Sequence, residues 1–172
     1  MRNPDYRLLY FISGTIIIVD QFTKILIQKM VSFGISYFPP ERIEIIEDFL
    51  YLVHIGNEGA AWGLFSQFKE LLVILSIVML FLIYFARKHF QLEKRPMQIA
   101  FGFLIGGILG NLIDRIRMGY VIDFIDIHLP FSIPVILPLG RWPAFNIADS
   151  AIVIGLAIYL LRSGSINQSK IH

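Results

Sequence analysis

The sequence predicts an all-α membrane protein with four transmembrane helices, a small extracytoplasmic β element and an interfacial helix. Two observations favour this fold class. Hydrophobic residues make up 56% of the 172 residues and charged residues 16%, and the mean hydropathy is +0.67, a composition typical of integral membrane proteins. In addition, four apolar stretches approach the length of about 20 residues that crosses a hydrocarbon core. The total length corresponds to one domain, residues 1–172.

The four apolar stretches cover residues 8–28, 68–86, 97–116 and 145–161. The first follows a short basic lead, as the apolar region of a secretory signal peptide would. It continues through polar residues without a small-x-small cleavage site, so we expect a retained transmembrane helix. The last stretch is short, and its start is therefore expected at the membrane interface.

Basic residues fix the expected orientation, because Lys and Arg are enriched in cytoplasmic loops. They gather at both termini and in the 87–95 connection: Arg2, Arg7, Arg87, Lys88, Lys94, Arg95, Arg162 and Lys170. The termini and this connection are therefore predicted to be cytoplasmic. The segments 31–67 and 117–144 are predicted to be extracytoplasmic.

The two extracytoplasmic segments have different compositions. Residues 37–40 are typical of a turn, and residues 49–55 are enriched in aromatic and β-branched types, which predicts a strand. Small residues and a tryptophan at 59–65 suit the membrane interface. Four prolines forbid a long helix in the second segment: Pro130, Pro134, Pro138 and Pro143.

Several function classes are disfavoured by composition. Cysteine is absent, which excludes a thiol nucleophile, an iron–sulfur cluster and disulfides. The net charge is only +2, and no basic stripe predicts a nucleic-acid partner. The four histidines show no metal-ligand spacing, and the pair Asp126 and His128 is too small a set for a metal site. No metal or cofactor is therefore expected.

Asp123 and Asp149 are the strongest candidates for chemistry. Carboxylates near hydrocarbon are costly, so a functional role is the default hypothesis for each. Taken singly, Asp149 would be interpreted as a helix cap and Asp123 as a solvated loop carboxylate. They flank one proline-rich loop at the same membrane face, however, which makes a paired site at least as plausible. Two such carboxylates can share a proton, as in aspartic proteases.

Asp114 and Arg115 end the third apolar stretch. An Asp–Arg pair at this position is most often structural, and Asp114 also competes with Asp123 as the second catalytic acid. Asn111 precedes Arg115 by four residues, so both project from one helical face. This face has the donors to bind substrate carbonyls, and the structural and binding interpretations of Arg115 have equal support.

Asp20 and Lys24 are spaced i, i+4 in the first apolar stretch, which predicts a structural ion pair. Asn57 is by default a turn residue. Three glycines four residues apart, namely Gly102, Gly106 and Gly110, have the spacing that lets helices approach closely. The same glycines would leave room for a lipidated substrate.

Five stretches, in order along the chain, resemble the lipoprotein signal peptidase (signal peptidase II) family. They are Val19-Asp20-Gln21-x-Thr23-Lys24, Asn57-x-Gly59-Ala60-Ala61-Trp62-Gly63, Gly106-Gly107-x-x-Gly110-Asn111-x-x-Asp114-Arg115, Val121-Ile122-Asp123-Phe124 and Phe145-Asn146-x-Ala148-Asp149-Ser150. The resemblance implies a membrane aspartic endopeptidase that removes signal peptides from diacylglyceryl-modified bacterial prolipoproteins. It also implies a multi-pass protein of the bacterial cytoplasmic (inner) membrane, with its active site at the extracytoplasmic face.

The resemblance implies roles for individual residues. Asp123 and Asp149 would form the catalytic dyad. The residues expected to bind substrate are Asn57, Asn111, Arg115 and Asn146. Structural or supporting roles are expected for Asp20, Lys24, Asp114, Gly59, Gly107 and Gly110. The expected partners are the prolipoprotein substrate and membrane lipids, with the enzyme as a monomer.

Two features depart from the family pattern. Glu58 stands where a small hydroxyl residue is common, and the loop between the two acids is lengthened by proline-rich sequence at 129–139. We expect the geometry of the dyad to survive both changes. The lengthened loop is expected to affect how the substrate reaches the site.

Two other functions remain as alternatives. In a small proton-coupled transporter or channel, Asp20, Lys24, Asp114 and Arg115 would line a polar path. Such a path needs polar residues through the membrane, yet residues 71–85 and 152–161 contain almost none. An assembly factor or anchor without activity would leave the paired acids unexplained.

Overall fold

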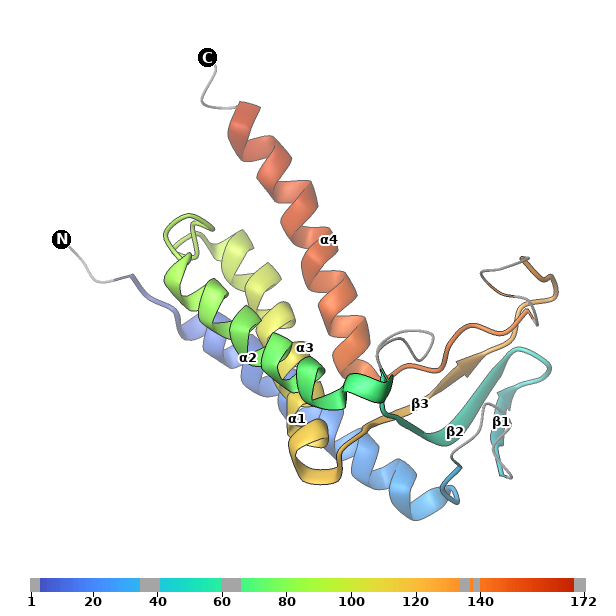
Figure 1. Ribbon diagram of the computed structural model, residues 1–172. Helices are drawn as coiled ribbons and strands as arrows, with labels where there is room; N and C mark the ends of the chain where they lie inside the picture. Colours follow the sequence, from blue (N-terminus) through green and yellow to red (C-terminus); the bar gives the residue numbers. More distant parts are fainter. Residues whose placement is uncertain (1–3, 35–40, 60–65, 134–136, 138–139, 169–172) are drawn as a thin grey trace. The chain divides into compact units, whose positions relative to one another are not determined.

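The computed structural model describes residues 4–34, 41–59, 66–133, 137 and 140–168 (Figure 1). The elements are α1 (Arg7–Met30), β1 (Ile43–Ile46), β2 (Leu50–Asn57), the 3-10 turn η2 (Ser66–Phe68), α2 (Lys69–Phe85), α3 (Arg95–Met118), β3 (Val121–Ile127) and α4 (Ile147–Gln168). The expected turn at 37–40 and most of the expected interfacial helix at 59–65 lie outside the described residues.

The protein is mostly helical, as predicted, and the small β element expected beside the helices is an antiparallel sheet of three strands in the order β1-β2-β3. Each of the four apolar stretches contains or overlaps one helix. Among the described residues, α1 and α3, each of 24 residues, are long and apolar enough to cross a membrane by length and composition.

The chain divides into two compact units, the first comprising residues 1–20, 73–113 and 147–172. Its core is an apolar cluster of Leu9, Ile83, Leu92, Met97, Ala100 and Phe101. Close helix packing depends on glycine: a Cβ on Gly106 would lie 2.7 Å from the Ile16 Cβ on α1. On α3 and α4, Gly107 and Gly155 likewise face backbone atoms where a Cβ would clash.

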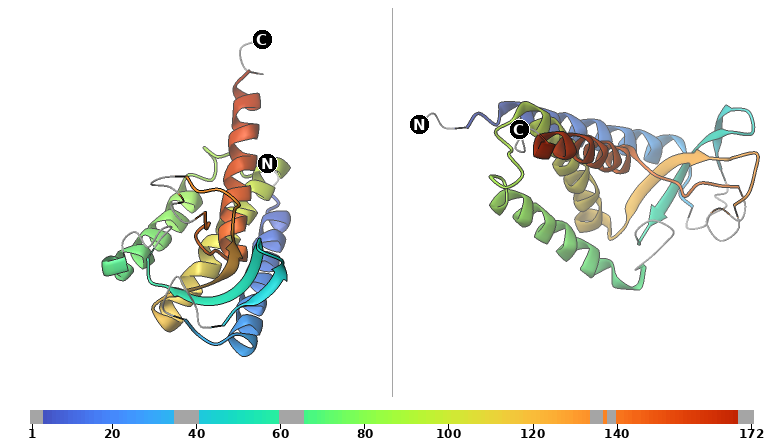
Figure 2. Two further views of the ribbon diagram at one scale, coloured as in Figure 1. Left: turned by 90° about the vertical axis from the view of Figure 1, so that its right-hand side faces the viewer. Right: turned by 90° about the horizontal axis from the view of Figure 1, so that it is seen from above.

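The second unit comprises residues 21–72 and 114–146 and contains the sheet. Strand β2 pairs with β3 from Leu50 opposite Ile127 to Asn57 opposite Val121. The register shifts between Leu52 and Ile55, and Figure 2 shows β2 curving along its length. Such irregularities bend a strand and increase its twist.

Strand β3 was not predicted from the sequence, which placed its residues in a loop. All seven of its residues are at least partly hidden, and five of them are buried. A strand that is covered on both faces shows no alternation of polar and apolar residues. Its two aspartates also resemble loop residues, since aspartate is depleted in strands.

Candidate active site

Asp123 lies in strand β3 and is only 3% exposed, so its interpretation as a solvated loop carboxylate is wrong. Its Oδ2 accepts a hydrogen bond from Asn57 Nδ2 at 2.9 Å. Its Oδ1 accepts one from Asn146 Nδ2 at 2.8 Å. Two uncharged amides therefore orient the carboxylate, one from β2 and one from the segment that precedes α4.

Asn57 combines the turn role expected from the sequence with contact to an acid. Its Oδ1 accepts a hydrogen bond from the Gly59 backbone N–H at 2.9 Å, which is an Asx turn. The Gly59 carbonyl in turn accepts a bond from Arg115 Nη2 at 3.1 Å. Within this unit the structure thus links five of the predicted site residues: Asn57, Gly59, Arg115, Asp123 and Asn146.

Asp149 lies in the first turn of α4, in the first unit. Its Oδ1 accepts a hydrogen bond from Asn111 Nδ2 at 2.7 Å. Asn111 is 5% exposed, whereas Asp149 is half-buried. This acid is therefore also oriented by an asparagine amide, and it retains access to solvent.

Asp114 has a different environment from Asp123. Its Oδ2 lies 2.7 Å from Lys24 Nζ, and the two side chains are 1% and 2% exposed. Gln21 Nε2 donates to its Oδ1 at 2.9 Å, and the Ile122 N–H donates to its Oδ2 at 3.2 Å. Asp114 therefore ties α1 to the start of β3.

The sequence expectation paired Lys24 with Asp20, but the ion pair described for Lys24 is with Asp114. Asp20 is fully buried, and its Oδ1 accepts a hydrogen bond from the Ala148 N–H at 2.9 Å. Because the first N–H groups of a helix have no intrahelical partner, Asp20 caps α4 from another helix. Gly110 makes room for this contact, since a Cβ there would lie 2.7 Å from Asp20 Oδ2.

A further polar cluster was not predicted from the sequence. Arg141 forms two hydrogen bonds to Asp126, at 2.7 Å from Nε and 2.6 Å from Nη2. His128 Nε2 lies 3.0 Å from the same carboxylate. Asp126 and His128 were noted in the sequence as a pair, but their spacing does not indicate that Arg141 would bind Asp126.

Strands β1 and β2 carry titratable groups with shifted pKa values. The Asp48 N–H and the Tyr51 side chain hydrogen-bond the Glu44 carboxylate, which lowers the pKa of Glu44 below 4.5. Burial, followed by the bond to Glu44, raises the pKa of Tyr51 above 10.0. Both groups lie in the segment predicted to be extracytoplasmic.

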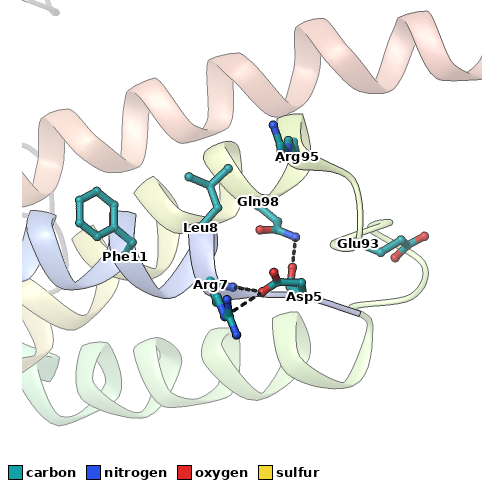
Figure 3. Close-up of a pocket in the computed structure, with 7 residues that line it drawn as sticks. All are labelled: Asp5, Arg7, Leu8, Phe11, Glu93, Arg95 and Gln98. Carbon is teal, nitrogen blue, oxygen red and sulfur yellow. Dashed lines mark hydrogen bonds and ion pairs between the residues drawn. The ribbon is translucent and has the colours of Figure 1, made fainter. Parts of the chain in front are cut away.

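A cavity of about 700 Å³ lies in the first unit, where α1 and α3 begin, and Figure 3 shows the side chains around it. It is lined by Asp5, Arg7, Leu8, Phe11, Glu93, Arg95 and Gln98. The Gln98 side chain donates to the Asp5 carbonyl at 2.6 Å. None of the predicted site residues lines this cavity.

A comparison with solved structures identifies the class of protein. A bacterial membrane enzyme, solved by the in meso method at 2.3 Å resolution, superposes with a TM-score of 0.78 and 31% sequence identity. The match covers 94% of this chain and 90% of that chain. The fold is therefore that of a membrane enzyme.

Sequence comparisons identify the family. Residues 12–164 match the family model described as signal peptidase (SPase) II. The lipoprotein signal peptidase of Syntrophotalea carbinolica is 34% identical over 94% of this chain and 93% of its own length. That of Halothermothrix orenii is 33% identical over 90% and 93%. The chain belongs to the signal peptidase II family, which confirms the resemblance deduced from its motifs.

Proposed function

We propose that this chain is a membrane aspartic endopeptidase that removes signal peptides from diacylglyceryl-modified bacterial prolipoproteins. The proposal is based on the buried Asp123 carboxylate. Each of its two oxygens accepts a hydrogen bond from the side-chain amide of an asparagine. The two amides fix the orientation of the carboxylate, and a fixed orientation is what proton transfer to or from a substrate requires.

Asp123 and Asp149 act in this proposal as one dyad. The covalent chain supports the pairing, because Asn146, which binds Asp123, precedes Asp149 by only three residues. Three residues span at most about 11 Å even when fully extended. The family membership gives further support, since the two acids stand in the motifs that carry the resemblance.

The dyad shares one proton, so one carboxylate is a base while the other is an acid. The base takes a proton from a water molecule, whose oxygen forms a bond to the scissile carbonyl carbon. The acid gives its proton to the carbonyl oxygen. The resulting tetrahedral intermediate collapses, the C–N bond breaks, and the amine leaves with a proton returned by the dyad. This reaction requires neither a metal nor an organic cofactor.

The remaining site residues position the substrate. Asn111 and Arg115 project from one face of α3, and their donors suit peptide carbonyl oxygens. The contact of Arg115 with the Gly59 carbonyl supports a second role, in which it shapes the chain beside Asn57. The small residues at 59–63 and the glycines of α3 would accommodate the acyl chains of the substrate.

The enzyme is proposed to cross the bacterial inner membrane four times as a monomer. The spans correspond to α1, α2, α3 and α4, with the termini and residues 87–95 in the cytoplasm. Residues 31–67 and 117–144 then lie outside, where the dyad meets the prolipoprotein.

The structure disfavours the transporter alternative. Lys24 and Asp114 neutralise each other in a pair that is almost fully hidden from solvent, and Asp20 caps α4. These side chains therefore have structural partners, whereas a conduction path needs groups that meet the transported ion.

Cleavage of a synthetic prolipoprotein peptide by the protein purified in detergent tests the proposal. We expect cleavage without a partner protein or an ion gradient, and no cleavage by Asp149→Asn. The matched peptide without its diacylglyceryl group should be processed far more slowly, because each buried methylene contributes about 0.8 kcal/mol. Equal rates on the two peptides would indicate a general peptidase, and no cleavage of either would refute the proposal.

A further inference from the structure

The Arg141–Asp126 ion pair has no role in the proposed chemistry, yet it is among the best-formed polar contacts of the protein. The guanidinium binds both carboxylate oxygens. The Arg141 side chain is 8% exposed and that of Asp126 only 1%. Burying such a pair is costly, and a buried ion pair is best understood as a means of specifying one arrangement over another.

The pair lies on the face of β3 opposite Asp123. Successive side chains of a strand point to opposite faces, and Asp123 and Asp126 are an odd number of residues apart in β3. The register shift between Leu52 and Ile55 places the extra residue on β2, so β3 keeps its alternation from Asp123 to Asp126. The ion pair therefore contacts one face of β3, while Asn57 and Asn146 contact Asp123 on the other face.

Arg141 begins a segment that runs antiparallel beside β3 and ends at Asn146. The Trp142 N–H donates to the Ile127 carbonyl at 2.9 Å. Ile125 and Phe145 exchange two backbone hydrogen bonds, at 2.8 and 3.1 Å. The next residue is Asn146, whose amide reaches Asp123.

The register of this segment decides which side chain reaches Asp123. A slip of one residue turns every side chain to the other face, so Asn146 would point away from the acid. Backbone hydrogen bonds select the register only in part: Pro143 offers no N–H, but the other residues of the segment all offer the same donor and acceptor. The Arg141–Asp126 pair does select it, since a slipped segment would leave two buried charges without each other.

We infer that the Arg141–Asp126 ion pair fixes the register of residues 141–146 on β3, so that Arg141 and Asp126 are positioning residues for the catalytic Asp123. They act through Asn146 and do not touch the substrate. The inference rests on the proposed function for its kinetic consequence, but the register itself is measurable without catalysis.

The double variant Asp126→Leu/Arg141→Met tests the kinetic consequence. It removes both charges together and so avoids an unpaired buried charge, and such replacements usually leave a protein folded. We expect an unfolding temperature close to that of the wild type, an unchanged KM for the lipidated peptide, and a kcat lowered by roughly 10- to 100-fold. Arg42→Met is the matched control, because Arg42 stacks on Tyr51 in the same sheet and lies outside residues 141–146; its kcat should not change.

Cysteine cross-linking tests the register directly, since the chain has no cysteine of its own. The pair Ile125→Cys/Phe145→Cys reports the observed register, and Ile125→Cys/Ala144→Cys reports a slip by one residue. With the ion pair intact, only the first should form a disulfide; in the double variant the second should form as well.

The two measurements separate the inference from the proposed function. If the wild type fails to cleave the lipidated peptide, the proposed function is wrong while the cross-linking result still decides the register. If the double variant keeps the original cross-link alone together with the wild-type kcat, the inference is overturned. A lowered unfolding temperature with wild-type register and kcat would overturn it equally, because the pair would then serve stability alone.

Discussion

Asp114 and Asp123 are both buried acids near the C-terminal end of α3, but their partners differ. Asp114 faces the ammonium of Lys24 at 2.7 Å, whereas the bonds described for Asp123 come from two asparagine amides. The contact with Lys24 gives Asp114 a structural role between α1 and β3. We therefore expect Asp123 to be the partner of Asp149 in proton sharing.

Asparagine substitutions should separate these acids. Asp123→Asn and Asp149→Asn should each abolish turnover, because the amide has no proton to share. Asp114→Asn should retain measurable turnover in the folded fraction, while losing about 3–5 kcal/mol of stability because the buried ion pair with Lys24 is broken. Single-turnover cleavage of a lipidated peptide, combined with thermal unfolding in detergent, measures both effects.

The double variant Asp123→Asn/Asp149→Asn is the internal control, and its loss should be no greater than that of either single variant, since the two acids act as a unit. Cleavage by Asp123→Asn together with inactivity of a folded Asp114→Asn would assign the dyad to Asp114 and Asp149.

Glu44, in the hairpin of β1 and β2, should make the stability of the fold depend on pH. Because its pKa is lowered in the folded protein, Glu44 stabilises the fold at pH values above its ordinary pKa of 4.5. This contribution disappears as the pH falls through the lower native pKa. The unfolding temperatures of the wild type and Glu44→Gln should therefore differ at neutral pH and converge in acid.

Glu47→Gln is the matched comparison, because it removes the same charge from the adjoining turn. It leaves in place the hydrogen bond from the Asp48 N–H to the Glu44 carboxylate. The same convergence in Glu47→Gln would show that general charge, and not the hydrogen bonds of Glu44, causes the pH dependence.

Glycine decides how closely α1 and α3 approach within the first unit. An alanine Cβ at Gly106 would lie 2.7 Å from the Ile16 Cβ and 3.0 Å from the Ser13 carbonyl oxygen. Overpacking of this kind costs about 1–3 kcal/mol, more than the gain in helix propensity of about 0.5–1 kcal/mol. Gly106→Ala should therefore lower the unfolding temperature.

Gly14→Ala on α1 should maintain or raise the unfolding temperature, because nothing lies within 4 Å of the position that a Cβ would take there. If both variants respond alike, close packing is not the reason for glycine at position 106.

Periodicity and length were enough to locate the helices, since the stretch expected at 97–116 is α3, Arg95–Met118. The catalytic role of Asp123 and Asp149 stays a prediction, and their asparagine partners Asn57 and Asn111 were named from the sequence only as substrate-binding residues. The partners of the buried charges were not predictable. Spacing favoured Asp20 for Lys24, because local pairs are visible in a sequence, whereas the contact with Asp114 depends on how α1 and α3 pack.

Strand β3 shows a second limit of sequence patterns. The run Val121-Ile122-Asp123-Phe124-Ile125-Asp126-Ile127 contains β-branched residues throughout, but a strand covered on both faces lacks alternation. The role of Arg141 was missed for the same reason as that of Asp114: its partner is 15 residues away on a neighbouring segment.

The whole chain should have one orientation in the membrane. The excess of Lys and Arg at the termini and at residues 87–95 predicts that these regions are cytoplasmic. A reporter enzyme fused after Leu92 should therefore be active only as a cytoplasmic reporter, and one fused after Asp48 only as an exported reporter. Activity of the Leu92 fusion as an exported reporter would reverse the proposed topology.

The contact of Lys24 with Asp114 has a consequence for biosynthesis. A nascent chain that has released only α1 and α2 carries Lys24 before Asp114, the partner of its described ion pair, has been synthesised. A lysine at the centre of a membrane helix costs about 2.5–3.5 kcal/mol on insertion scales, and Lys24, which lies nearer the end of α1 at Met30, costs part of that amount. Chains truncated just before Arg95 should therefore insert α1 less completely than chains that extend past Met118, as measured by glycosylation mapping. Replacing Lys24 with leucine should remove that difference, because insertion of α1 would then no longer depend on the synthesis of Asp114 in α3.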